Sequence, residues 1–170
     1  MKWKNSSWAT AIWTLLRVYL GWNWLESGYG KVFGAQSAVW VGKKAGVAVT
    51  GFLHGALSKT SGPHPDVQWW YAWFVQHVAL PNVKVFSYMV SVGELLVGLA
   101  LIFGAFTTIA LIGGVFMNLN YLFAGSVSVN PIFLIEEVIL LWAGAAAYYW
   151  GVDRFLIPSL RERFLRKGLV

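Results

Sequence analysis

The sequence predicts an all-α integral membrane protein, a four-helix transmembrane bundle that forms a single domain over 1–170. Composition is the first reason. Of the residues, 58% are hydrophobic and 12% are charged, whereas a soluble domain has about 25% charged residues. The second reason is that four stretches approach the roughly 20 apolar residues that a spanning helix needs. Strands are not expected, because an open sheet leaves backbone groups unpaired in lipid and nothing here repeats as in a barrel.

The four predicted spans are joined by connections of very different length. Almost nothing separates the second from the third, which predicts an antiparallel hairpin. Pro131 opens the fourth and suits the first turn of a helix, where a missing N–H costs little. The first span is expected to be retained, since no small-residue exit of the signal-peptide type follows its long apolar stretch. The predicted spans are about 8–29, 85–104, 106–125 and 131–150.

The segment 30–84, between the first and second spans, is predicted to be a helical insertion at the outer membrane interface. Its stretch WWYAWF is too crowded with aromatic rings for a disordered loop, and such amphipathic rings favour the interface. The stretch 38–57 is moderately apolar, but Lys43, Lys44 and several glycines interrupt it. For that stretch, an interfacial and a membrane-inserted placement both stay open.

Basic residues at the two chain ends predict the orientation of a multi-pass protein in the cell membrane. The positive-inside rule places both termini in the cytoplasm. The tail 151–170 is predicted to be a basic amphipathic helix on the inner surface. The net charge of +6 then fits lipid head groups better than nucleic acid. The basic residues at the ends are Lys2, Lys4, Arg154, Arg161, Arg163, Arg166 and Lys167.

Ionisable side chains inside the predicted spans indicate a structural or functional role, because inserting each one into the membrane costs on the order of 2.5–3.5 kcal/mol. Arg17 and Glu94 fall near the middles of the first and second spans, which predicts an ion pair between these helices. Such a pair would set the helix register, with or without a catalytic role. Arg17 also shares a helical face with Gly21, Trp24 and Gly28, which predicts the close approach of a neighbouring helix.

Polar groups gather in the outer half of the predicted bundle. They predict a polar pocket that opens outward and is roofed by the aromatic segment 69–77. Adjacent Glu136 and Glu137 cannot both face one point, so one is expected to face the bundle and the other a neighbouring helix or the interface. The polar residues assigned to this half are Glu26, Glu136, Glu137, Asn118 and Asn120.

Several classes of chemistry are excluded by residue type. The chain has no cysteine, so it supplies no disulfide, thiol, iron–sulfur ligand or cysteine zinc site. His54, His64 and His77 lack the spacing of a metal motif, and neither a metal nor a covalent cofactor is expected. Phosphate-binding, dinucleotide-binding, zincin and nucleophile-elbow motifs are absent. Redox work would therefore need a bound quinone or a partner chain.

Strings along the chain resemble, in order, the motifs of the DoxX/DoxD membrane family. LLRVYLGWNWLESGYGKVFG resembles its first helix, with an arginine, a Leu-Gly and a glycine-x-x-lysine exit. VALPNVKVFSYMVSVGELLVGLALIFGAFTTIA resembles its second helix. MNLNYLFAGSVSVNP and YYWGVDRFLIPSL resemble the third helix with its exit loop and the chain end, so the resemblance covers roughly 10–160. It implies a four-helix membrane bundle and a role in respiratory electron transfer.

The DoxD branch implies the first function hypothesis, a membrane subunit that passes electrons from a small sulfur donor such as thiosulfate to quinone. Arg17 would hydrogen-bond the quinone or an anion, and Glu94 or Glu136 would exchange the proton that accompanies quinone reduction. The residues expected to bind substrate or quinone are Trp24, Glu26, Asn118, Asn120, Trp73 and His77.

Two alternatives use the same buried charges. One is a non-catalytic membrane anchor, assembly factor or detoxification accessory, in which the charges are structural. The other is a small-molecule or proton carrier, although the chain lacks the inverted repeat typical of transporters. The expected partners are the lipid bilayer, a small DoxA-like subunit or another redox protein, and further copies of the chain.

Overall fold

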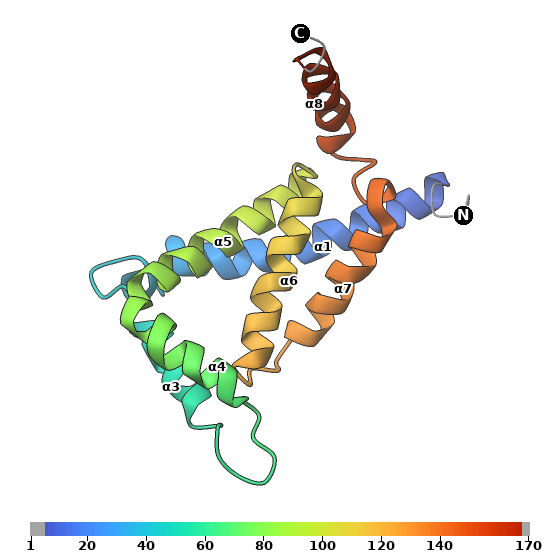
Figure 1. The fold of residues 1–170 in the computed structure, drawn as a ribbon. Helices are drawn as coiled ribbons and strands as arrows, with labels where there is room; N and C mark the ends of the chain where they lie inside the picture. Colours follow the sequence, from blue (N-terminus) through green and yellow to red (C-terminus); the bar gives the residue numbers. More distant parts are fainter. Residues whose placement is uncertain (1–5, 168–170) are drawn as a thin grey trace.

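The computed structural model describes residues 6–167, which fold into helices with no strand among them (Figure 1). Four of the helices lie at the predicted spans, although their ends differ by a few residues. The helices are α1 (Ser7–Val32), α2 (Ser37–Trp40), α3 (Val47–Leu57), α4 (Trp69–Phe74), α5 (Val83–Phe103), α6 (Thr107–Phe123), α7 (Asn130–Ala143) and α8 (Asp153–Lys167).

The helices α1, α5, α6 and α7 pack into a bundle in which α1 contacts both α5 and α7, and α6 lies between α5 and α7. The predicted glycine face of α1 is confirmed: Gly21 lies against Gly98 and Leu101, and Gly28 lies against Leu95. Because the α5 numbers fall as the α1 numbers rise, these two helices are antiparallel. The main core lies between the four helices and consists of Leu20, Trp24, Val97, Leu101, Ala110, Leu111, Leu140, Ala143 and Ala147.

The fourth predicted span is shorter than expected. The sequence predicts a helix over 131–150, but α7 ends at Ala143, because Gly144 adopts a left-handed φ of 61°. A short 3-10 turn, Gly144–Ala146, follows. The chain then turns before α8, so Trp150 lies beside the first helix, where its indole Nε1 donates to Thr10 Oγ1 at 3.2 Å.

The aromatic segment 69–77 is not a separate interfacial helix. Instead, α4 runs through a π-helical turn (Val75–Ala79) and a 3-10 turn (Leu80–Asn82) directly into α5. Pro81 lies in the 3-10 turn, where its missing N–H and its ring disrupt a regular α-helix. The aromatic stretch therefore extends the second predicted helix at its N-terminal end.

The stretch 38–57 is not one continuous helix. It is divided into α2 and the 11-residue α3, and the left-handed Gly46, at a φ of 97°, separates them. At 1.5 Å per residue, α3 is far too short to cross a bilayer. Its buried face packs against the α4 region in a second core made of Val49, Leu53, Ala56, Val67, Tyr71, Val75, Ala79 and Ala124.

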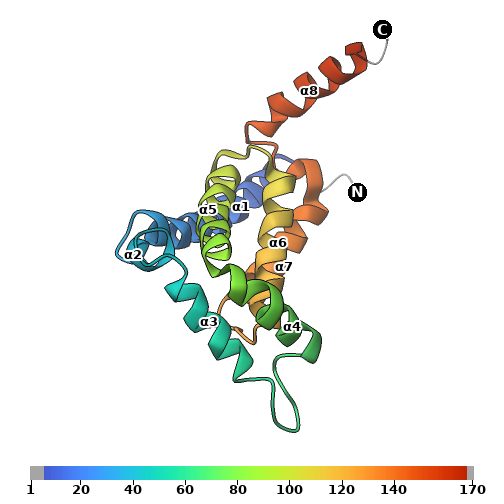
Figure 2. The same cartoon turned by 60° about the vertical axis from the view of Figure 1, so that its left-hand side comes forward.

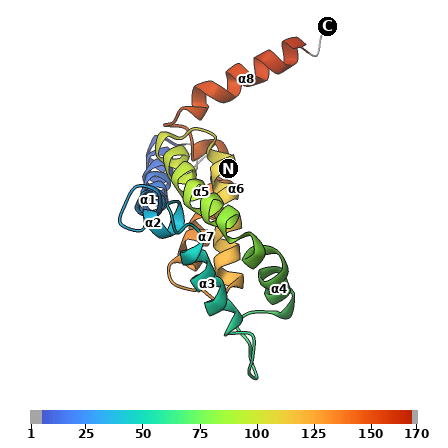
Figure 3. The same ribbon diagram turned by 90° about the vertical axis from the view of Figure 1, so that its left-hand side faces the viewer.

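The helices α3 and α4 lie at one end of the molecule and α8 projects from the other, with the bundle of α1, α5, α6 and α7 between them, as all three views show (Figures 1, 2 and 3). The predicted tail helix over 151–170 is confirmed as helix α8 over Asp153–Lys167. Lys2 and Lys4, which support the predicted orientation, lie outside the described residues, as do the side chains of Arg163, Arg166 and Lys167.

Among residues 6–167, one helical stretch is both long and apolar enough to cross a membrane. This is Trp69–Phe103, which has 35 residues and contains an 18-residue window with a mean hydropathy of 2.0. The apolar helices α3 and α6 are shorter. Helix α1 has 26 residues, but Arg17, Glu26 and Lys31 interrupt its apolar character.

Candidate functional site

A cavity of about 320 Å³ lies between α1, α5, α6 and the start of α7. This volume falls at the lower end of the range of small-molecule sites, about 300–1,000 Å³. Glu94 at its wall is 2% exposed, whereas Val129 is 49% exposed, so the cavity runs from a buried polar end to an open rim beside α7. Its lining residues are Asn23, Trp24, Glu26, Ser27, Glu94, Tyr121, Val129, Asn130 and Phe133.

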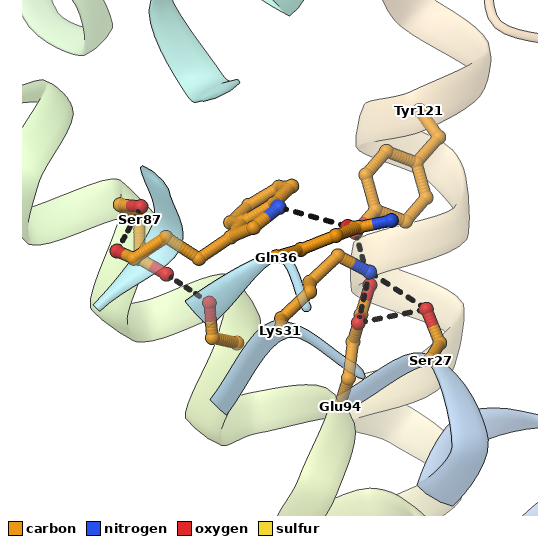
Figure 4. A network of polar contacts seen from close by, with 8 residues as sticks. Ser27, Lys31, Gln36, Ser87, Glu94 and Tyr121 are labelled. Atoms are coloured by element: carbon orange, nitrogen blue, oxygen red, sulfur yellow. Dashed lines mark hydrogen bonds and ion pairs between the residues drawn. The ribbon is translucent and has the colours of Figure 1, made fainter. Parts of the chain in front are cut away.

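The buried end of the cavity is a hydrogen-bonded network around the Glu94 carboxylate (Figure 4). Lys31 Nζ forms an ion pair with Glu94 Oε2 at 2.5 Å and also donates to Ser27 Oγ at 2.6 Å. Ser27 Oγ donates to the same Oε2 at 3.0 Å. The Tyr121 hydroxyl donates to Glu94 Oε1 at 2.6 Å. Two helices, α1 and α6, therefore supply donors to the Glu94 carboxylate on α5, so both oxygens of this buried group have hydrogen-bond partners.

The predicted ion pair between Arg17 and Glu94 is wrong, because Glu94 pairs with Lys31 instead. The prediction assumed that the midpoints of the two helices lie at the same depth. In the structure, the α1–α5 register is set where backbones meet at Gly28 and Gly98, which places Glu94 beside the end of α1. Fourteen residues separate Arg17 from Lys31, which is about 21 Å along a helix.

Arg17 belongs to a different site, at the α8 end of the bundle. Its side chain is 1% exposed, and its Nη2 donates to the carbonyl of Trp150 at 3.2 Å. Gly104 and Gly151 leave the space that the guanidinium occupies, since a Cβ on either would meet Arg17 Nη1. Arg17 therefore holds the turn before α8 against α1, and it does not line the cavity.

The same turn is fixed by Asp153. Its carboxylate accepts hydrogen bonds from the backbone N–H groups of Phe106 and Thr107, both at 2.7 Å. These are the donors that the first turn of α6 leaves without intrahelical partners. The first turn of α8 and the start of α6 are thus joined beside Arg17.

A second buried carboxylate, Glu137, lies in the core. It is 0% exposed and accepts from Trp24 Nε1 at 3.1 Å and from Asn118 Nδ2 at 3.0 Å. The expectation that one of the adjacent glutamates faces the bundle is confirmed for Glu137. Glu136, which the sequence hypothesis put in the catalytic set, is only half-buried and does not line the cavity.

Gly114 makes room for the Glu137 carboxylate, because a Cβ there would collide with Glu137 Oε1. We expect Gly114→Ala to destabilise the protein by about 2 kcal/mol, since the carboxylate must leave its donors. The adjacent Gly113→Ala is the control, because its Cβ meets only Val97 at an ordinary 3.5 Å. Thermal unfolding of both variants in the same detergent measures the difference. Equal losses would contradict this role of Gly114.

Three residues of the predicted binding set lie away from the cavity. Asn120 packs against α4, where the Tyr71 hydroxyl donates to its carbonyl at 3.0 Å. Trp73 and His77 stack on each other on an exposed face. The predicted aromatic roof is therefore wrong: segment 69–77 covers α3 and the end of α6, because its apolar side packs into the second core. Asn118 lies behind the cavity, on Glu137.

The sequence hypothesis missed Ser27, Lys31 and Tyr121. Lys31 lies one helical turn beyond Ser27 and close to the glycine face, so helical spacing alone places it beside α5. Tyr121 lies three residues after Asn118, hence on nearly the same side of α6. Trp24 and Glu26 were correctly expected at the pocket, and both line it.

Comparison with known protein families assigns the chain to one of them. The family model for DoxX matches residues 12–126, which include most of α1, all of α5 and α6, and therefore most of the cavity wall. The chain belongs to the DoxX family. Because DoxX proteins are membrane proteins, this chain is a membrane protein, and the exposed apolar side chains of α1, α6 and α7 agree with a lipid environment. Comparisons with curated proteins and with solved structures found no match.

In this DoxX protein, the cavity lining combines aromatic rings with a hydrogen-bonded polar end. The side chains of Trp24 and Phe133 both line it and pack against each other, with ring centroids 6.3 Å apart and a tilt of 48°. The Glu94 network supplies a carboxylate, an ammonium and a phenol at the buried end. Glu26 at the wall adds a further carboxylate, which disfavours an anion in the cavity.

Proposed function

We propose that this DoxX protein is a membrane subunit of a respiratory oxidoreductase, and that its cavity binds the head group of a quinone. The observation that carries the proposal is the Glu94–Lys31–Tyr121 network at the buried end of an aromatic-walled cavity. Reducing a quinone to a quinol takes two electrons and two protons. A carboxylate hydrogen-bonded to a phenol and paired with an ammonium is a suitable group to exchange those protons.

The electron donor in this proposal is a small sulfur compound such as thiosulfate. Oxidation of two thiosulfate ions to one tetrathionate releases the two electrons that the quinone takes up. The carboxylates of the cavity repel a dianion, and the chain has no cysteine, so we place the donor on a partner subunit similar to DoxA. Quinone then enters from the lipid, past the exposed rim at Glu26 and Val129.

The topology proposed with this function has α1, α5, α6 and α7 crossing the membrane and both termini in the cytoplasm. With 17 and 14 residues, α6 and α7 are shorter than the roughly 20 residues of an average span. Local thinning of the bilayer accommodates such short helices at a modest cost.

A bound quinone is the first expected result. Protein purified in mild detergent should release quinone into organic solvent, seen as an ultraviolet band that disappears with borohydride. Val129→Trp should lose at least about two thirds of this quinone, because the large ring fills the cavity rim. Val127→Trp is the matched control, since Val127 is exposed on the same connection but does not line the cavity. Folded wild-type protein without quinone, which also binds none added, would reject the proposal.

A non-catalytic anchor is the second candidate, and one observation favours it. Both Glu94 oxygens already accept hydrogen bonds from the chain itself, so the network is complete without a ligand. If Glu94→Gln leaves quinone content and sulfur-dependent quinone reduction of the membrane unchanged, the network is structural and the anchor is the better description.

A further inference from the structure

The segment 33–46, here called the strap, lies between α1 and α3 and carries α2. It begins two residues after Lys31 and folds back so that Trp40 contacts Lys31. The Trp40 ring centroid lies 5.0 Å from Lys31 Nζ, on the ammonium that pairs with Glu94. The Lys31 side chain is 13% exposed as a result. The strap contributes no residue to the cavity, so Lys31 lies between Trp40 and the cavity wall at Glu94.

Helix α5 fixes the strap at two adjacent carbonyl groups. Ser87 Oγ, in a fully buried residue, donates to the Trp40 carbonyl at 2.6 Å, and the Tyr88 hydroxyl donates to the Val41 carbonyl at 2.8 Å. The Trp40 ring is fixed separately, because its Nε1 donates to Gln36 Oε1 at 3.2 Å. Backbone and ring of Trp40 are thus both restrained where the ring meets Lys31.

A lysine at this position has an alternative side-chain conformation, in which its ammonium points into water. Its flexible stem lets the ammonium reach water, and exposed ion pairs of lysine contribute little. An ammonium is also attracted to the face of an indole ring, the best of the cation–π partners. Trp40 therefore favours the one Lys31 conformer in which the ammonium contacts Glu94 and Ser27.

We infer that Trp40 is a positioning residue for the Glu94 site, acting through Lys31, and that Ser87 holds the strap in place. Without the ring, Lys31 turns toward water and Glu94 loses its cation. The inference adds to the proposed function by naming what fixes the charge of that site. It does not depend on quinone, since the geometry concerns residues of this chain alone.

The test is the rate at which an amine-reactive acetylating reagent modifies Lys31 in the full-length protein in detergent, measured by mass spectrometry. Lys43 and Lys44 are exposed on the same strap and serve as internal references. We expect Lys31 to react slowly in the wild type. In Trp40→Leu, its rate relative to Lys43 should rise about two- to fivefold, the factor expected for one cation–π contact. Ser87→Ala should also raise the rate of Lys31 modification relative to Lys43.

Two further variants separate this inference from a general loosening of the fold. Trp40→Phe keeps an aromatic face and should restore slow modification of Lys31, which loss of packing alone would not predict. Trp73→Leu removes an equally large exposed ring at α4 and should leave Lys31 unchanged. If Trp40→Leu does not fold, Ser87→Ala and Gln36→Ala carry the test. Unchanged Lys31 protection in the folded variants, or equal exposure in Trp40→Phe and Trp40→Leu, would overturn the inference, whatever the quinone experiments give.

Discussion

Replacement of Glu94 by glutamine should lower the free energy of unfolding by about 3 kcal/mol, because it leaves the Lys31 ammonium without its counter-charge. Both side chains are shielded, at 13% exposure for Lys31 and 3% for Glu94. Breaking one member of such a pair is costly, since the remaining charge stays desolvated. Unfolding in mixed detergent and dodecyl sulfate is the appropriate measurement.

The matched variants form a double-mutant cycle. Lys31→Met alone should also destabilise, but the double variant with Glu94→Gln should recover most of the loss, because a buried pair is replaced by neutral groups of similar size. An additive double variant would mean that the two charges do not interact. If the single Glu94→Gln variant is as stable as the wild type, the Lys31 ammonium becomes solvated without loss of free energy of unfolding.

The second large effect is expected at the contact between α1 and α5. A Cβ on Gly28 would lie 2.7 Å from Leu95 Cα and 2.9 Å from the Glu94 carbonyl carbon. Both are backbone atoms, which cannot turn aside as a side chain does, so Gly28→Ala forces the helices apart. We expect Gly28→Ala to lower the free energy of unfolding by about 3 kcal/mol, which is at the upper end of overpacking effects.

Gly30 supplies the control for this prediction, since it lies in the same helix and nothing surrounds its missing Cβ within 4 Å. Gly30→Ala should be neutral or stabilise by up to about 1 kcal/mol, because alanine favours helix over glycine. If the free energy of unfolding falls in Gly28→Ala and does not fall in Gly30→Ala, close helix packing at Gly28 is the cause of the loss. Similar small effects at both positions would contradict the observed register. Because Gly28 adjoins Glu94, Gly28→Ala should also reduce the bound quinone.

Much of the fold could be predicted because it depends on local sequence. The apolar stretches predict α1, α5 and α6 within a few residues, and Pro131 suits the first turn of α7. The shared face of Gly21, Trp24 and Gly28 follows from helical periodicity, and these residues are buried as expected. Family membership likewise follows from short motifs in order along the chain.

The partners of the buried charges could not be predicted in the same way. Periodicity states which face of a helix a residue occupies, but not which residue of the next helix lies opposite. That depends on the sliding register of α1 on α5, which is decided by backbone contact at Gly28 and Gly98. The Arg17–Glu94 pair and the Lys31–Glu94 pair that forms differ by fourteen residues of α1, which is about 21 Å along the helix.

The sequence by itself therefore determined that this is an apolar, helical DoxX protein with glycine-lined helix contacts and a few costly buried charges, since each of these depends on residue type and spacing. The tertiary structure alone decided that Glu94 meets Lys31 and Tyr121, that Glu137 rather than Glu136 is buried, and that Arg17 holds the turn before α8. The physical reason is that a buried charge needs a partner in space, and distance along the chain does not specify which helix brings it.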